Sequence, residues 1–182
     1  FKLDDVHDIK GKDIPDIELA TASFPCNDLS LAGSRHGLAG TQSSAFWGFV
    51  DAIKGMGKRR PPLVLLENVA GFLTSNDGND FRDALLALNE LGYAVDAFII
   101  DASRFVPQSR QRLFVVGSKA ASNTLKEALR TFMQSDVRPP ALADFIFMNP
   151  EIGWAIRTLP PLPPSTERLA DIIEYVPLIS EL

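Results

Sequence analysis

The sequence predicts an α/β fold with a doubly wound, mainly parallel sheet. Segments with helical periodicity alternate along the chain with short apolar segments of strand length. The chain has 182 residues, 46% of them hydrophobic and 23% charged, which is enough for one substantial core. Strands that alternate with helices favour right-handed βαβ units, and such units place parallel strands side by side.

The first half of this pattern begins at residue 16. Residues 16–24 end in a strand, and residues 43–57 repeat apolar side chains at helical spacing. Residues 62–68 form a short apolar run that is entered through Pro61 and Pro62, as is typical of a buried parallel strand. We therefore expect a strand, a helix and a second strand in this order.

The second half repeats the alternation. Leucines at helical spacing predict a helix over 80–93, with Gly92 as its stop. Strand-like segments follow at 94–101 and 112–118.

Beyond Lys119 the pattern changes. Residues 122–134 predict an amphipathic helix, and the Pro-rich residues 159–176 predict a linker that carries a short helix. We accordingly divide the chain into a core over 1–120 and a C-terminal region over 121–182, which leads toward a region for recognising the target.

Charge is distributed unevenly. The formal net charge of −5 argues against nucleic-acid binding by the whole surface. Residues 54–60 and 102–119, however, each hold four basic residues and no acid. If these two clusters converge in space they form a phosphate-binding surface, and otherwise they are two solvated patches.

Cysteine content and hydropathy indicate the compartment. A single cysteine excludes an intrachain disulfide and cannot by itself build a thiolate metal site. The N-terminal 18 residues are too polar for a secretory signal, and no apolar run reaches membrane-spanning length. We expect a cytoplasmic protein, associated with the nucleoid if bacterial, with no membrane or metal partner.

Chemically distinctive residues follow the predicted strands. Cys26 comes after the first strand, Glu67 ends the second, and Arg110 and Arg112 lie in the turn between the last two. Ligands of such sheets bind beyond the carboxyl ends of the strands, so these side chains are expected to face one crevice. Each also has an ordinary interpretation: a small buried thiol, a salt-bridging carboxylate, and two arginines that alternate across a strand edge.

Three short motifs carry a resemblance to a known family. FPCNDLS (24–30), ENV (67–69) and QSRQR (108–112), in this order, resemble motifs of the cytosine-specific DNA methyltransferases that modify carbon 5. As many residues separate Cys26 from Glu67 as separate Glu67 from Gln108. The resemblance implies the Rossmann-like fold of S-adenosylmethionine-dependent methyltransferases. Because no glycine-rich cofactor turn precedes Phe1, we expect that fold to be truncated at the N-terminus.

The resemblance also implies a reaction, in which a methyl group passes from S-adenosylmethionine to carbon 5 of cytosine in double-stranded DNA. Carbon 5 is a poor nucleophile until a thiolate, here Cys26, attacks carbon 6. Glu67 is then the residue at ring nitrogen 3, and Arg112, with Arg110 beside it, holds the carbonyl oxygen.

The family acts on a base that has been extruded from the duplex. The Gly- and Ser-rich residues 29–44 are expected to form a mobile loop over the DNA, in which Arg35 contacts a phosphate. An ordinary connection is the alternative for this segment. Phe24, Asn68 and Gln108 are expected to border the bound substrate.

Cofactor binding is assigned to a few residues. By resemblance to a third family motif, Asp8 approaches the adenine amino group of S-adenosylmethionine, and Phe24 and Pro25 border the same pocket. An ordinary surface aspartate is the alternative for Asp8. We interpret the chain as the catalytic portion of a larger enzyme.

Two further functions stay open at this point. Related enzymes methylate transfer RNA with the same Cys and Glu, so an RNA cytosine methyltransferase is one alternative. A noncatalytic fragment that does not bind the cofactor is the other. Within the favoured class, we expect a microbial enzyme that is paired with a restriction enzyme.

Overall fold

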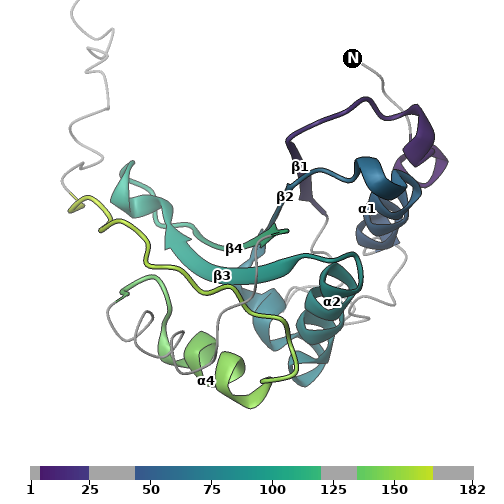
Figure 1. Cartoon of the computed structure of the whole chain (residues 1–182). Helices are drawn as coiled ribbons and strands as arrows, with labels where there is room; N and C mark the ends of the chain where they lie inside the picture. Colours follow the sequence, from purple (N-terminus) through teal and green to yellow (C-terminus); the bar gives the residue numbers. More distant parts are fainter. Residues whose placement is uncertain (1–4, 25–43, 120–134, 166–182) are drawn as a thin grey trace, which may run out of the picture.

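A computed structural model of the chain describes residues 5–24, 44–119 and 135–165 (Figure 1). Within these ranges, four strands form one sheet in the order β1-β2-β4-β3, and three α-helices accompany them. The strands are β1 (Leu19–Ser23), β2 (Leu63–Val69), β3 (Ala94–Asp101) and β4 (Gln111–Ser118), and the helices are α1 (Ser44–Gly55), α2 (Asn79–Glu90) and α4 (Pro140–Met148). The predicted α/β class is confirmed.

Most elements lie where the periodicity places them. The helices predicted over 43–57 and 80–93 are α1 and α2, and β3 has the predicted bounds. Helix α4 is not among the predicted elements. Proline is well tolerated at the first helical position, and Pro140 begins α4. The helix expected over 122–134 lies outside the described residues.

The expectation of a mainly parallel sheet needs a correction. Strands β1, β2 and β3 run in one direction and β1 pairs with β2 in parallel, but β4 is antiparallel to both of its neighbours, β2 and β3. The connection between β3 and β4 spans only residues 102–110, which suffices for a hairpin and is too short for the crossover that a parallel pair requires.

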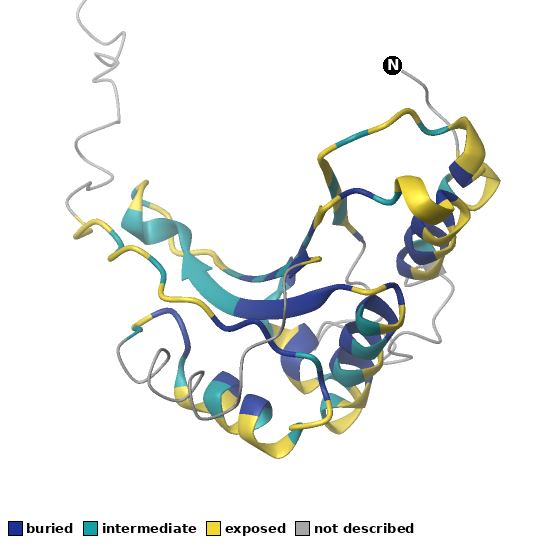
Figure 2. Cartoon of the chain, in the orientation of Figure 1, coloured by how far each residue is buried: buried dark blue, intermediate teal, exposed yellow. Residues whose placement is uncertain are grey.

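The hydrophobic core lies on one face of the sheet. Figure 1 shows α2 and α4 on the same side of the sheet, and both helices contain buried residues that belong to the hydrophobic core (Figure 2). Ring contacts link α1 to α2 through this layer, from Phe46 to Phe24 at 5.4 Å, on to Phe72 at 5.5 Å and then to Phe81 at 5.4 Å.

The opposite face is more exposed. Along β2 the burial alternates, so that Val64 and Leu66 are buried whereas Leu63, at 42% exposure, lies on the other face with Glu67. We see no helix packed on this second face in the ranges that the structure describes. The second helical layer of a doubly wound sheet is therefore not among those residues.

The outer edge of β3 is closed by residues of the C-terminal region. The backbone N–H of Ile99 donates to the carbonyl of Val137 at 2.8 Å, and Val95 exchanges two backbone hydrogen bonds with Gly153 and Ala155 at 2.9 and 2.7 Å. Pairing of this kind protects an edge strand from association with other chains. The boundary near residue 120 stays a prediction, but residues of α4 and of 152–156 belong to the same core as the sheet.

A buried ion pair joins this region to β3. Arg138, which is fully buried, donates from Nη2 to both carboxylate oxygens of Asp96 at 2.6 and 2.8 Å, and from Nε to the carbonyl of Ala97 at 3.1 Å. Burial raises the pKa of the Asp96 carboxyl, and the Arg138 guanidinium opposes that rise.

Across the described ranges, the helices are too short or too polar to span a membrane.

Candidate active site

The strands bring several sequence motifs to one end of the sheet. The carboxyl ends of β1, β2 and β3 lie at this end, and antiparallel β4 begins there. Ser23 at the end of β1 is in register with Glu67 of β2, and Val69 of β2 is in register with Arg112 of β4. The structure therefore brings the ENV and QSRQR motifs together, as the strand-end argument predicts.

Glu67 and Arg112 form the centre of the site. Arg112 Nε lies 2.7 Å from Glu67 Oε1, with side-chain exposures of 20% and 30%. Glu67 is in register with Phe114, and Arg112, two residues before Phe114, lies on the same face of β4. The guanidinium thus reaches the carboxylate diagonally across two strands, on the open face of the sheet.

The second Glu67 oxygen has its own donor. The hydroxyl of Ser23 donates to Glu67 Oε2. Each oxygen of the carboxylate therefore accepts from a different strand, Oε1 from β4 and Oε2 from β1. Sequence reasoning did not identify Ser23, and the register of β1 against β2 is what reveals it.

Arg110 has a different environment from Arg112. Its side chain is exposed, and its backbone N–H donates to Asp101 Oδ1 at 3.0 Å. Gln108 is also exposed, and its backbone N–H donates to the carbonyl of Val106 at 2.7 Å. Of the two arginines predicted to face Glu67, the structure places Arg112 against it.

Asp101 organises the hairpin that carries these residues. Its carboxylate accepts from the backbone N–H of Ser103 at 2.9 Å, from that of Arg110, and from the Ser109 hydroxyl at 2.9 Å. The backbone donors Ser103 and Arg110 lower the pKa of Asp101 to about 2. Sequence reasoning missed Asp101, although Asp followed two residues later by Ser is a common turn signal.

Asn68 and Phe24 lie on the helical side of the sheet. Asn68 is buried, and its amide donates to the Phe24 carbonyl at 3.4 Å, while its Oδ1 accepts from the backbone N–H of Val69 at 2.8 Å. Phe24 is buried against Phe46 and Phe72. Both residues thus support the chain just before Cys26, and their predicted contacts with substrate and cofactor stay predictions.

Other predicted site residues are exposed or not described. Asp8 is exposed at the end of a short 3₁₀ helix, Val6–Asp8, that packs against α1. Pro25, Cys26 and Arg35 lie outside the described residues, so their roles stay predictions.

The basic cluster at 54–60 does not lie at this site, and from the second cluster Lys119 donates to the Arg60 carbonyl. Arg59 donates to the carbonyls of Ile14, Gly11 and Lys12 at 2.7, 3.1 and 3.2 Å. Arg60 donates to the carbonyl of Leu91. These contacts lie near the start of β2, at the opposite end of that strand from Glu67. Both arginines therefore stabilise the backbone of neighbouring segments.

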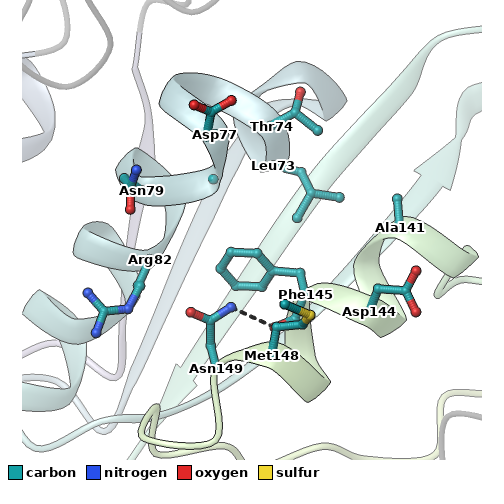
Figure 3. Close-up of a pocket in the computed structure, with 11 residues that line it drawn as sticks. Leu73, Thr74, Asp77, Asn79, Arg82, Ala141, Asp144, Phe145, Met148 and Asn149 are labelled. Atoms are coloured by element: carbon teal, nitrogen blue, oxygen red, sulfur yellow. Dashed lines mark hydrogen bonds between the residues drawn. The ribbon is translucent and has the colours of Figure 1, made fainter.

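A separate pocket opens on the helical side of the protein (Figure 3). It has a volume of about 540 Å³ and lies between the end of a 3₁₀ segment (Ala70–Gly78), the start of α2, and α4. Figure 3 shows Phe145 of α4 in its middle, with the Asn149 amide donating to the Phe145 carbonyl at 2.8 Å. Its lining does not include Ser23, Glu67 or Arg112, so it is distinct from the candidate active site.

Comparisons with known proteins give a consistent result. The sequence profile of a family described as C-5 cytosine-specific DNA methylase matches residues 1–175. The type II methyltransferase M.BsuFI of Bacillus subtilis is 40% identical over 114 residues, which is 62% of this chain and 27% of that protein. The orphan methyltransferase M.SPRI of Bacillus phage SPR is 27% identical over 174 residues, which is 93% of this chain and 38% of that protein.

Solved structures show the same fold. The Dnmt2 methyltransferase of S. pombe superposes with a TM-score of 0.51 at 24% identity, over 74% of this chain and 41% of that one. This likeness confirms the predicted methyltransferase fold. The chain spans less than half the length of each of these three relatives.

Proposed function

The chain belongs to the C-5 cytosine-specific DNA methylase family, and from this premise we propose that it methylates carbon 5 of cytosine in double-stranded DNA, with S-adenosylmethionine as the methyl donor. The observation that supports this most directly is the Glu67–Arg112 pair at the strand ends. A carboxyl group and a guanidinium side by side match two neighbouring positions of a cytosine ring, nitrogen 3 and the carbonyl oxygen.

Cys26 supplies the nucleophile in this proposal. Its thiolate forms a bond to carbon 6, and the electron pair of the 5,6 double bond moves to carbon 5, which would take the methyl group of S-adenosylmethionine and release S-adenosylhomocysteine. Loss of the carbon 5 proton to a base, with cleavage of the sulfur–carbon bond, then regenerates the thiolate. A protonated or hydrogen-bonding carboxyl group of Glu67 at nitrogen 3 relieves the negative charge that develops on the ring, and the Arg112 guanidinium stabilises it at the carbonyl oxygen.

S-Adenosylmethionine supplies the electrophilic methyl group when it is bound. Asp8 is exposed, which leaves its carboxylate accessible to an amino group. Phe24 lies immediately after β1, at the strand edge where ligands of such folds bind. We propose that these two residues and Pro25 contribute to the cofactor site.

The cytoplasmic location inferred from the composition stays a prediction.

Covalent trapping tests the proposed reaction. Duplex DNA of random sequence that contains 5-fluorocytosine should form a denaturation-resistant adduct with the protein in the presence of S-adenosylmethionine, because fluorine cannot leave carbon 5 as a proton does. Cys26→Ser should abolish the adduct, and the same duplexes with ordinary cytosine should give none that persists. Adduct formation by Cys26→Ser at the wild-type level would contradict the proposed nucleophile.

The same assay separates the alternative functions. Transfer RNA that contains 5-fluorocytosine should form no adduct if DNA is the substrate, whereas an adduct with RNA alone would favour an RNA methyltransferase. A noncatalytic fragment would trap neither nucleic acid.

Similarity to type II methyltransferases supports a role alongside a restriction enzyme.

A further inference from the structure

We propose that Ser23 is a positioning residue that holds Glu67 in its reactive orientation. This inference rests on the proposed function, and it concerns a residue outside the three motifs. Ser23 is the register partner of Glu67 across the parallel β1–β2 pair, and its hydroxyl donates to Glu67 Oε2. The hydrogen bond therefore follows directly from the strand pairing.

Glu67 needs a second anchor because Arg112 has two tasks. In this structure Arg112 Nε is paired with Glu67 Oε1, and in the proposed reaction the same guanidinium also binds the carbonyl oxygen of cytosine. A guanidinium shared between the base and the carboxylate holds Glu67 through one oxygen only. Among the described residues, Ser23 is the other donor to Glu67, so it limits rotation of the side chain during the reaction.

The position of Ser23 argues against a purely structural role. It is exposed at the last residue of β1, and a serine there fills no space in the core. Thr21 offers a direct comparison, because it lies two residues earlier on the same face of the same strand and is opposite Leu65. The Thr21 hydroxyl therefore has the same position relative to the β1–β2 pair as the Ser23 hydroxyl, but its register partner is the apolar Leu65.

Steady-state kinetics of three variants test this inference on random-sequence duplex DNA with S-adenosylmethionine. Ser23→Ala should lower kcat roughly tenfold through loss of a hydrogen bond to a charged group. KM for DNA and for S-adenosylmethionine should stay unchanged, because Ser23 touches Glu67 rather than either substrate. Ser23→Thr keeps the hydroxyl and should retain kcat within about twofold of the wild type, and Thr21→Ala should match the wild type.

Several outcomes would overturn the inference. Wild-type kcat in Ser23→Ala would show that Glu67 needs no second anchor, and an equal loss in Ser23→Thr would exclude the hydroxyl as the cause. A raised KM for DNA at constant kcat would make Ser23 a DNA contact instead. If Cys26→Ser is fully active, the proposed function fails, whereas loss in Cys26→Ser together with wild-type kcat in Ser23→Ala refutes this inference alone. Thermal unfolding of each variant verifies that it is folded.

Discussion

Glu67 is held by donors from the strands on either side of it. Arg112 on β4 and Ser23 on β1 each occupy one carboxylate oxygen, and the group is only partly exposed. Such charge-assisted hydrogen bonds are stronger than neutral ones and fix the plane of the carboxylate. The orientation of the proposed reacting group is thereby set before a base binds.

Arg112→Lys tests the guanidinium at this position. A lysine has a single donor atom and cannot contact Glu67 and a base oxygen in the fixed geometry of a guanidinium, so we expect kcat to fall by about 10²-fold. Single-turnover methylation with saturating DNA measures the effect. Arg104→Lys is a matched control, because Arg104 makes an exposed ion pair with Asp136 at 3.4 Å and should retain activity. Equal rates for Arg112→Lys and the wild type would refute the assignment.

At the scale of elements, the hairpin of residues 102–110 determines where β4 begins. Asp101 organises this turn through three accepted hydrogen bonds, from Ser103, Ser109 and Arg110. The backbone N–H of Ala102 adds a bond to the Arg110 carbonyl at 3.1 Å. Because Arg112 is the second residue of β4, the geometry of the turn determines where its guanidinium lies.

The hairpin should depend on the charge of Asp101. Its pKa in the folded protein is about 2, below the ordinary value of an aspartate. The stabilisation is therefore complete above about pH 4 and is lost as the pH falls through the folded-state value. An NMR titration of the Ser103 and Arg110 amide signals should show a midpoint near 2. A midpoint at the ordinary aspartate value would contradict the role of these hydrogen bonds.

Asp101→Ala should loosen the same turn at neutral pH. We expect the Ser103 and Arg110 amides to exchange with solvent at least about tenfold faster, because their acceptor is gone. Hydrogen-exchange NMR measures this. Asp83→Ala, at an exposed position of α2, is the control and should leave both amides unchanged.

At the scale of the whole molecule, the C-terminal region completes the sheet. Backbone hydrogen bonds from residues 137–155 close the outer edge of β3. The buried ion pair between Asp96 and Arg138 joins β3 to this C-terminal region. The backbone N–H of Arg157 also donates to Asp96 Oδ2 at 3.0 Å. The core of the sheet therefore depends on residues far along the chain.

Asp96→Ala should destabilise the protein strongly. Removal of one partner leaves the Arg138 charge buried without compensation, which typically lowers the free energy of unfolding by about 3–5 kcal/mol. Urea denaturation measures the free energy of unfolding of each variant. Glu151→Ala, which breaks the half-exposed Arg82–Glu151 pair, should lower it by at most about 1 kcal/mol. A similar effect of the two substitutions would show that the buried pair does not anchor this region.

Local patterns in the sequence determined much of this protein. Helical spacing of apolar residues located α1 and α2, and short apolar runs located β2 and β3, because these periodicities depend only on neighbouring residues. Three ordered motifs predicted the family, which the match over residues 1–175 confirms. The strand-end rule predicted that Cys26, Glu67, Arg110 and Arg112 would face one crevice, and of these residues the structure places Arg112 against Glu67.

Tertiary structure decided the rest. Register between strands selects Arg112 over Arg110 as the partner of Glu67 and brings Ser23 to its second oxygen, and register is a relation between distant segments. The sequence left the basic cluster at 54–60 open as a phosphate-binding surface or a solvated patch, whereas in the structure Arg59 donates to backbone carbonyls that folding brings near. The pairing of Asp96 with Arg138 likewise has no local signal, because what makes it necessary is burial, and burial arises only when the chain has folded.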